Sequence, residues 1–147
     1  IARGKVSSLA TFSPNAADAL VIPGGFGAAK NLSSYAFDGP KCKVHPDVAK
    51  AIKDMHACGK PIGALCIAPV LVAKVLGKVS LTIGDDQSTA DNLVAMGATH
   101  VPTSHGQIAI DRENKIVTTP CYMLNSRVDQ VAEGADNLIR AMLEMMA

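Results

Sequence analysis

The sequence predicts an α/β fold in which helices cover both faces of a mostly parallel sheet. Short apolar segments of strand length alternate along the chain with segments whose apolar residues repeat every three or four positions. The strand segments are apolar throughout, as is typical of strands buried on both faces of a parallel sheet. The chain has 147 residues, of which 48% are apolar, so we expect a single domain over residues 1–147.

The first half of the chain begins with an apolar strand over residues 19–23, which ends at Gly24 and Gly25. After a loop that contains glycine and serine, residues 44–58 have the pattern of a helix, with Pro46 in its first turn. The apolar face of this helix is formed by Val48, Ile52 and Met55. A glycine follows and ends the helix.

A cysteine stands where the next strand passes into a helix. Residues 62–65 form a short buried strand, Pro69 suits the first turn of a helix, and Gly77 ends that helix. A side chain at such a turn projects from the end of the sheet, beside free N–H groups of the new helix that favour a thiolate. We therefore interpret Cys66 as a nucleophile at a nucleophile elbow. A buried structural cysteine is the alternative.

The second half continues the alternation of strands and helices. Residues 81–84 form a third apolar strand. The helix after it begins with Ser88 and Asp91 as a capping box and runs to Gly97. A further short strand is expected over residues 99–102.

A β-hairpin and a long helix complete the chain. The strands of the hairpin are residues 108–110 and 116–118, and residues 111–114 form its turn. The C-terminal helix is amphipathic, because its apolar residues are spaced by three and four positions: Val128, Val131, Ala135, Leu138 and Met142.

The glycine-rich loop over residues 23–31 satisfies neither of two common nucleotide-binding motifs. A dinucleotide-binding fingerprint requires a glycine where Lys30 stands, and a P-loop requires one where Ala29 stands. The sequence therefore predicts neither NAD nor ATP binding, and no cofactor is expected.

The same loop is expected to provide hydrogen-bond donors to a substrate. Gly24 and Gly25 allow main-chain N–H groups to approach a ligand closely. Neighbouring parallel strands end at the same edge of a sheet, so this loop should lie beside Cys66. One N–H from the loop and the N–H of Ile67 could then form an oxyanion hole for a carbonyl group attacked by the thiol. The alternative is a tight turn that needs glycine only for its shape.

Other candidate residues are less specific. His100 and His105 are each more typical of a surface or capping histidine than of a base. His105 is the better acid–base candidate of the two, because its neighbours Ser104 and Gly106 are typical of a loop. Cys121 follows the last strand of the hairpin, where it either packs or lies at the rim of the site.

Zinc ligands are also present, but their spacing argues against a metal site. Cys42 and His45 form one pair, and His56 and Cys58 form another. Because His56 and Cys58 are two residues apart on a predicted helix, their side chains point to different sides. We therefore predict no metal site.

Composition argues against several classes of partner. The net charge is +1, and Lys and Arg are scattered, so neither a nucleic-acid surface nor a charged membrane surface is expected. The longest apolar run, residues 62–73, is interrupted by Pro69 and is too short to span a bilayer. The four cysteines form no CxxC pair, which is typical of free thiols in a reducing compartment.

Four segments together carry a resemblance to a known family. They are Pro23-Gly-Gly-Phe-Gly-Ala-Ala-Lys-Asn-Leu32, Gly59-Lys-Pro-Ile-Gly63 with Cys66-Ile-Ala-Pro69, Leu81-Thr-Ile-Gly84, and Asn114-Lys-Ile-Val-Thr-Thr-Pro120. The chain resembles the ElbB family, also called the sigma cross-reacting or isoprenoid-biosynthesis glyoxalase family. This family belongs to the superfamily of PfpI proteases, Parkinsonism-associated deglycases and class I glutamine amidotransferase-like domains.

The resemblance implies a flavodoxin-like three-layer sandwich and a homodimer, with Cys66 as the reactive cysteine and no metal. Family members begin with a further strand and helix that supply an acidic residue beside the thiol, so we expect this N-terminal portion to be missing here. Ile67 stands where the protease relatives have histidine, which argues against peptidase activity. The bacterial branch implies a cytoplasmic location, and a mitochondrial one is the alternative if a transit peptide precedes the chain.

The resemblance also implies glyoxalase or deglycase activity on small dicarbonyls such as glyoxal. In this prediction the Cys66 thiolate attacks an aldehyde carbon, and the N–H groups of Gly25 and Ile67 hold the oxyanion. An acid–base group moves a proton to complete the conversion to a hydroxy acid. We expect this group to be the acidic residue of the missing N-terminal portion, with His105 as a weak substitute. The alternative is a protein without enzymatic activity in which Cys66 is a redox sensor or a binding residue.

Overall fold

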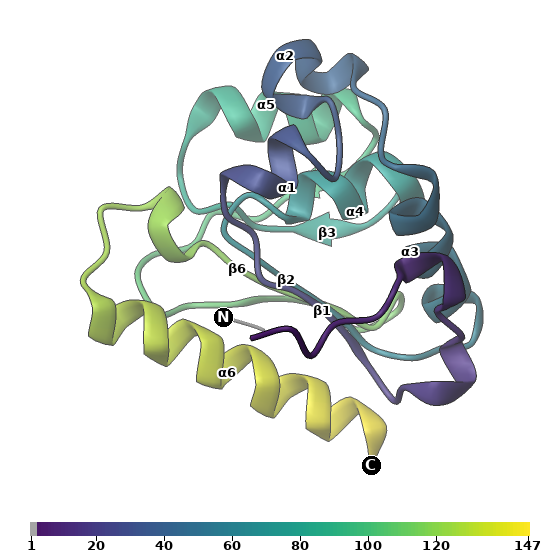
Figure 1. Ribbon diagram of the computed structural model, residues 1–147. Coiled ribbons are helices and arrows are strands. Elements are labelled where there is room, and N and C mark those ends of the chain that lie inside the picture. Colours follow the sequence, from purple (N-terminus) through teal and green to yellow (C-terminus); the bar gives the residue numbers. More distant parts are fainter. Residues whose placement is uncertain (1–2) are drawn as a thin grey trace.

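The computed structural model describes residues 3–147, and its centre is a four-stranded sheet (Figure 1). The strands are β1 (Leu20–Ile22), β2 (Ile62–Leu65), β3 (Ser80–Leu81), β4 (Thr99–His100), β5 (Ala109–Asp111) and β6 (Ile116–Thr119). The order in the main sheet is β1, β2, β6, β5, and a second sheet contains β3 and β4. All neighbouring strands are parallel except β5 and β6, which form the predicted hairpin.

Helices cover both faces of the main sheet (Figure 1). They are α1 (Phe26–Lys30), α2 (Tyr35–Asp38), α3 (Pro46–Ala57), α4 (Pro69–Leu76), α5 (Gln87–Ala95) and α6 (Val128–Met146), with four short 3-10 helices, η1 (Leu9–Thr11), η2 (Pro14–Ala16), η3 (Gly39–Lys41) and η4 (Cys121–Met123). The α6 helix packs on one face through Leu138 and Met142, whereas Ile52 of α3 and Leu71 of α4 belong to the core on the other face. The predicted flavodoxin-like α/β fold is therefore confirmed.

The β2 strand and the α6 helix approach each other closely at Gly63. A Cβ at this position would lie 2.5 Å from Met142 Sδ and 2.8 Å from Leu138 Cδ2. Both of these side chains are buried, so little space is left for a larger residue. Glycine thus allows α6 to lie close to the strand that ends at Cys66.

The third and fourth strands are shorter than the sequence predicts. The third strand is Ser80–Leu81 instead of residues 81–84. The next N–H group, that of Thr82, donates to Thr118 Oγ1 at 2.9 Å, so a side chain takes the place of a strand partner. The fourth strand likewise ends at His100 rather than at residue 102.

The predicted capping box of α5 is wrong. The N-cap residue is Asp86, whose carboxylate accepts a hydrogen bond from the Thr89 N–H at 2.8 Å. Asp91 instead accepts a hydrogen bond from the Gln87 side chain within the helix. The helix therefore begins earlier than the Ser88 box requires, and it ends at residue 95, before Gly97.

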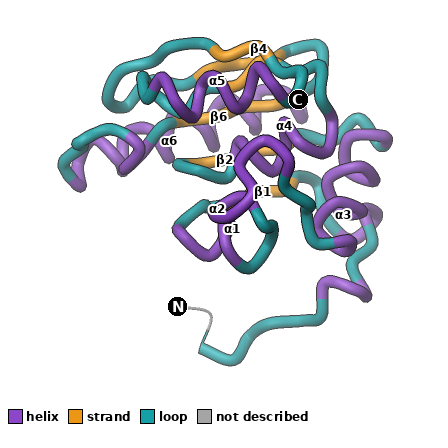
Figure 2. The backbone as a smooth tube through the Cα atoms, turned by 90° about the horizontal axis from the view of Figure 1, so that it is seen from above, coloured by secondary structure: helices purple, strands orange, loops and turns teal. Residues whose placement is uncertain are grey.

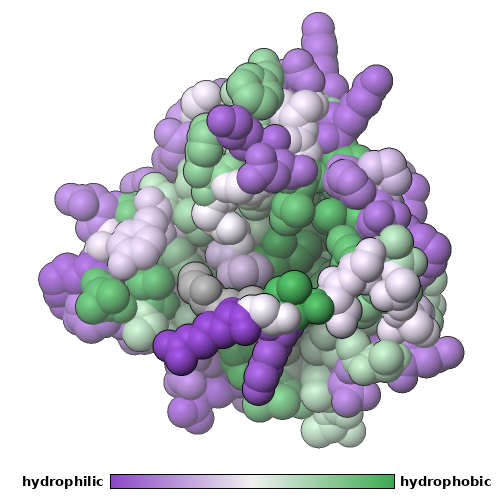
Figure 3. Space-filling model, in the orientation of Figure 1, coloured by the Kyte–Doolittle hydropathy of each residue, from purple (hydrophilic) through white to green (hydrophobic). Residues whose placement is uncertain are grey.

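Apolar side chains continue to the edge of the main sheet at β1. Leu20, Val21 and Ile22 line a hollow of about 190 Å³ together with Val48 and Ile52 of α3. Figure 3 shows apolar side chains gathered in the centre of the molecular face that it presents.

Within residues 3–147, no helix combines the length and the apolar character needed to cross a membrane.

Asp111 joins the two sheets. Its buried carboxylate accepts hydrogen bonds from the Ser80 N–H at 2.8 Å, from the Asn114 N–H at 3.0 Å and from the Asn114 side-chain amide at 2.9 Å. Burial by itself would raise the pKa of the Asp111 carboxyl, but the hydrogen bonds from Asn114 and Ser80 outweigh it and hold the pKa below its ordinary value. The ionised carboxylate therefore stabilises the contact between β3 and the hairpin.

The Asp111→Asn variant is expected to lose about 2 kcal/mol of unfolding free energy at neutral pH, because an amide cannot accept the same three hydrogen bonds. The contribution of Asp111 is complete above the pKa of the unfolded carboxyl, about 4, and is lost as the pH falls through the lower folded pKa. Urea unfolding from neutral pH to about pH 3 should therefore show a smaller acid-induced loss in the variant than in the parent.

The matched control is Asp136→Asn. Asp136 is an exposed carboxylate that pairs with Arg140 at 2.7 Å on the outer face of α6. Exposed ion pairs contribute little to stability, so this variant should unfold almost as the parent does. Equal losses in both variants would contradict a special role for Asp111.

Candidate functional site

Cys66 occupies the turn between β2 and α4. Its φ is 59°, a left-handed conformation that is uncommon for residues other than glycine. The Cys66 N–H donates to the Thr119 carbonyl at 2.9 Å, and the Ala68 N–H donates to the Leu65 carbonyl at 3.0 Å. These two bonds fix the turn at the carboxyl end of the sheet. The strand, turn and helix predicted around Cys66 are therefore present.

The glycine loop after β1 lies against this turn, because β1 pairs in parallel with β2. An added Cβ at Gly24 would overlap the backbone carbonyl oxygen of Leu65 and would lie 3.0 Å from the Cys66 Cβ. Gly24 and Gly25 have φ values of 87° and 82°, where a side chain strains the backbone. The predicted contact between the loop and Cys66 is confirmed, and at position 24 both the close approach and the backbone conformation require glycine.

A cavity of about 350 Å³ opens beside Cys66. It is lined by Gly25, Phe26, Ala29, Tyr35, Ala36, Cys66, Ile67 and Met123. None of these lining residues carries a charged side chain. Among the hydrogen bonds of residues 3–147, none uses the N–H of Gly25 or of Ile67, the two amides expected to form an oxyanion hole. The cavity thus combines a thiol and two uncommitted amides with an apolar wall, which suits a small neutral carbonyl compound.

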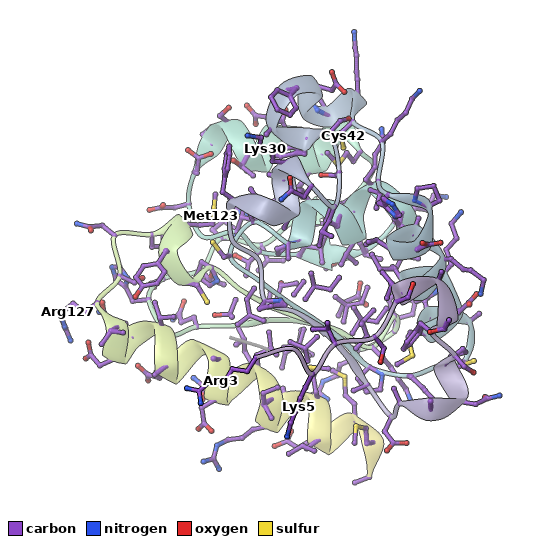
Figure 4. The ribbon with its side chains drawn as sticks, viewed as in Figure 1. Arg3, Lys5, Lys30, Cys42, Met123 and Arg127 are labelled. Carbon is purple, nitrogen blue, oxygen red and sulfur yellow. The ribbon has the colours of Figure 1, made fainter. Side chains whose placement is uncertain are left out.

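The sequence did not identify the wall of this cavity. Phe26 and Tyr35 lie on α1 and α2, two short helices within what the sequence predicts as a loop. Figure 2 shows these helices side by side near β1, and they are in contact. Met123 of η4 completes the wall from a segment far away in the sequence (Figure 4). No periodic signal marks these residues, because they meet only through the tertiary arrangement.

The structure places His105 outside the Cys66 cavity. His105 is exposed and lines a second cavity of about 330 Å³, together with Asp85. Its Nδ1 lies 2.7 Å from Ser126 Oγ, and Ser126 Oγ donates to the Cys121 carbonyl at 2.9 Å. Through these bonds His105 is linked to the backbone beside the site, but it does not join Cys66 in one cavity. No pattern in the sequence predicted that Ser126 links His105 to this backbone.

Cys121 is buried beside the turn that holds Cys66. It begins η4 directly after Pro120, and its φ is 46°. Burial raises the pKa of the Cys121 thiol, and the nearby Cys66 raises it further, while the Cys66 backbone N–H lowers it. Cys121 is therefore a buried neighbour of Cys66.

The histidines and cysteines considered for zinc have other surroundings. His56 Nε2 lies 3.1 Å from Asn114 Oδ1, Cys42 is buried, and Cys58 is exposed. In the part of the chain that the structure describes, no three His, Cys, Asp or Glu side chains are grouped where they could hold a metal ion.

The chain is similar to several known proteins. No protein-family model matches the chain. The chain is 44% identical over 154 residues to the human protein "Glutamine amidotransferase-like class 1 domain-containing protein 3, mitochondrial", and the match covers 99% of this chain. The same match covers 58% of the human protein, so the chain spans less than two thirds of that relative.

Solved structures are similar as well. An isoprenoid biosynthesis protein with an amidotransferase-like domain from Ehrlichia chaffeensis is 34% identical, with a TM-score of 0.87 over 97% of this chain and 66% of that one. Drosophila melanogaster DJ-1beta shares the fold, with 22% identity and a TM-score of 0.59 over 94% of this chain and 66% of that one.

Proposed function

We propose that this chain, which is similar to proteins with class I glutamine amidotransferase-like domains, is a cysteine-dependent enzyme that converts small dicarbonyls to hydroxy acids. The observation that carries the proposal is the position of Cys66, which lies at a left-handed turn in the wall of a cavity of about 350 Å³. Strained backbone conformations of this kind are common at active sites. Within the superfamily, the resemblance to ElbB supports glyoxalase or deglycase chemistry.

The first step of this proposal forms a carbon–sulfur bond. The Cys66 thiolate attacks an aldehyde carbon of the dicarbonyl, and the electron pair of the carbonyl double bond moves onto oxygen, which gives a hemithioacetal. The N–H groups of Gly25 and Ile67 would donate hydrogen bonds to that oxygen. Both amides belong to residues that line the cavity with Cys66.

The second step moves hydrogen from the hemithioacetal carbon to the neighbouring carbonyl carbon and leaves a thioester. Water then hydrolyses the thioester to the hydroxy acid and releases the Cys66 thiol. The hydrogen transfer needs an acid–base group, for which His105 is only a weak candidate from the sequence. Because His105 lines the other cavity, its replacement should reduce turnover less than replacement of Cys66 does.

The lining of the cavity favours small neutral substrates. Phe26, Ala29 and Met123 present apolar surface, and no charged side chain among the lining residues could pair with a carboxylate or a phosphate. Glyoxal and methylglyoxal meet these requirements, since both are small, uncharged dicarbonyls.

Location and assembly are part of the proposal. The human relative has "mitochondrial" in its name, which favours the mitochondrial alternative, and the cytoplasmic expectation has no support from this relative. The homodimer implied by the ElbB resemblance remains a proposal, and light scattering of the purified chain measures it directly.

The test of the proposed function measures labelling and turnover together. Iodoacetamide at limiting concentration should alkylate Cys66 before Cys42 and Cys121, which are buried, and methylglyoxal should slow the labelling of Cys66 more than that of exposed Cys58. Proton NMR should show the hydroxy acid accumulating in the same sample. Equal protection of Cys66 and Cys58, without any hydroxy acid, would contradict the proposal.

A further inference from the structure

Two cysteines share an uncommon backbone conformation at the ends of neighbouring strands. Among residues 3–147, four residues other than glycine have a positive φ, and Cys66 and Cys121 are two of them, at 59° and 46°. The β2 and β6 strands pair in parallel, with Leu65 opposite Thr119. Each cysteine therefore follows its strand by one or two residues at the same edge of the sheet.

One hydrogen bond joins the two turns, and a second one holds the turn at Cys121. The Cys66 N–H donates to the Thr119 carbonyl at 2.9 Å, which ties the turn after β2 to the end of β6. The Cys121 carbonyl accepts a hydrogen bond from Ser126 Oγ at 2.9 Å, which holds the first turn of η4. The thiol of Cys66 is also close enough to raise the pKa of the Cys121 thiol.

The two thiols differ in access. Cys66 lines the open cavity, so a dissolved oxidant reaches it first. Cys121 is only 8% exposed, so it reacts mainly with a group that its own chain presents. A reactive accessible thiol beside a protected second thiol is the arrangement in which oxidation ends in a disulfide rather than in a sulfinic acid.

We propose that Cys66 and Cys121 form a reversible disulfide within the chain when a hydroperoxide oxidises Cys66. The Cys66 thiolate attacks one peroxide oxygen, the O–O bond breaks, and with one proton the products are a sulfenic acid and an alcohol, or water from hydrogen peroxide. The Cys121 sulfur then displaces the hydroxyl group from the sulfenic acid sulfur, and its proton leaves with that hydroxyl as water. The two thiols lose two electrons, which reduce the peroxide.

This inference goes beyond the proposed function, because it does not depend on any dicarbonyl substrate. The disulfide removes the Cys66 thiolate, so the oxidised chain cannot add to a carbonyl until a thiol reductant restores it. Cys121 thereby protects Cys66 from irreversible oxidation to the sulfinic or sulfonic acid.

The experiment maps the disulfide by mass spectrometry in the folded 147-residue chain. Trypsin releases Cys66 in residues 54–74, together with Cys58, and releases Cys121 in residues 116–127. The parent for this experiment therefore carries Cys58→Ala, which leaves Cys66 as the only cysteine in its peptide. After hydrogen peroxide and alkylation of the remaining thiols, the two peptides should appear linked, with a mass lower by two hydrogens, and dithiothreitol should separate them.

Matched variants of this parent separate the possible outcomes. With Cys121→Ala, the link should be absent, and Cys66 should gain two or three oxygen atoms faster than in the parent. With Cys42→Ala, which removes another buried cysteine near α2 (Figure 4), the link should remain. Oxygen uptake on Cys66 at the same rate with and without Cys121, and no linked peptide in the parent, would overturn the inference. The presence or absence of the linked peptide in the parent tests the inference by itself, even if the Cys121 variant folds poorly.

Discussion

Replacement of Cys66 by serine is expected to lower kcat/KM for methylglyoxal by at least about 10³-fold. A serine hydroxyl stays protonated near neutral pH and adds to an aldehyde far more slowly than a thiolate does, so hemithioacetal formation is lost. The substitution changes one atom of a half-buried side chain, and the free energy of unfolding should change by no more than about 1 kcal/mol. Turnover is measured by hydroxy acid formation, and stability by urea unfolding.

The matched control is Cys58→Ser. Cys58 is exposed and precedes β2, whereas Cys66 follows it, so the two residues lie beyond opposite ends of the same strand. This variant should retain the turnover of the parent. Hydroxy acid formation that survives Cys66→Ser would assign the reaction to another residue and leave Cys66 with the redox role alone.

Replacement of Gly24 by alanine is expected to damage both stability and activity. The new Cβ would overlap the Leu65 carbonyl oxygen and crowd the Cys66 Cβ at 3.0 Å, and the φ of 87° adds backbone strain. We expect a loss of about 3 kcal/mol in the free energy of unfolding. Because the overlap displaces the turn that holds the thiol, kcat/KM should fall by about 10²-fold in the fraction that stays folded.

The control for this prediction is the neighbouring glycine. Gly25 has a similar φ of 82°, but an added Cβ there meets no atom within 4 Å. Gly25→Ala therefore carries the backbone strain without the overlap, and should lose only about 1–2 kcal/mol. If both variants lost the same stability and activity, the close contact between Gly24 and the Cys66 turn would have no role of its own.

A side chain larger than alanine at Gly25 tests whether this residue contributes to the oxyanion hole. A side chain there would extend into the space beside Cys66, since Gly25 lines the same cavity. If the side chain crowds the substrate, the variant at Gly25 should lose more activity than stability. A variant at Gly63 in the core should lose more stability than activity, because it disrupts packing.

The sequence determined those parts of the fold that depend on local patterns. The strand over Ile62–Leu65 and the helix over Pro69–Leu76 have the bounds that the apolar run, the proline and the glycine predict. The hairpin and α6 follow equally from turn residues and from apolar spacing. The turn at Cys66 could be predicted because its strand and its helix are both local.

Only the tertiary structure decided which residues meet at that turn. Phe26, Tyr35 and Met123 reach the cavity from three separate segments, His105 lies in another cavity, and Cys121 is buried beside the thiol. Directly after β3, the Thr82 N–H donates to the Thr118 side chain on β6. Such contacts depend on the register and spacing of strands distant in the chain, and residue periodicity within one segment carries no information about them.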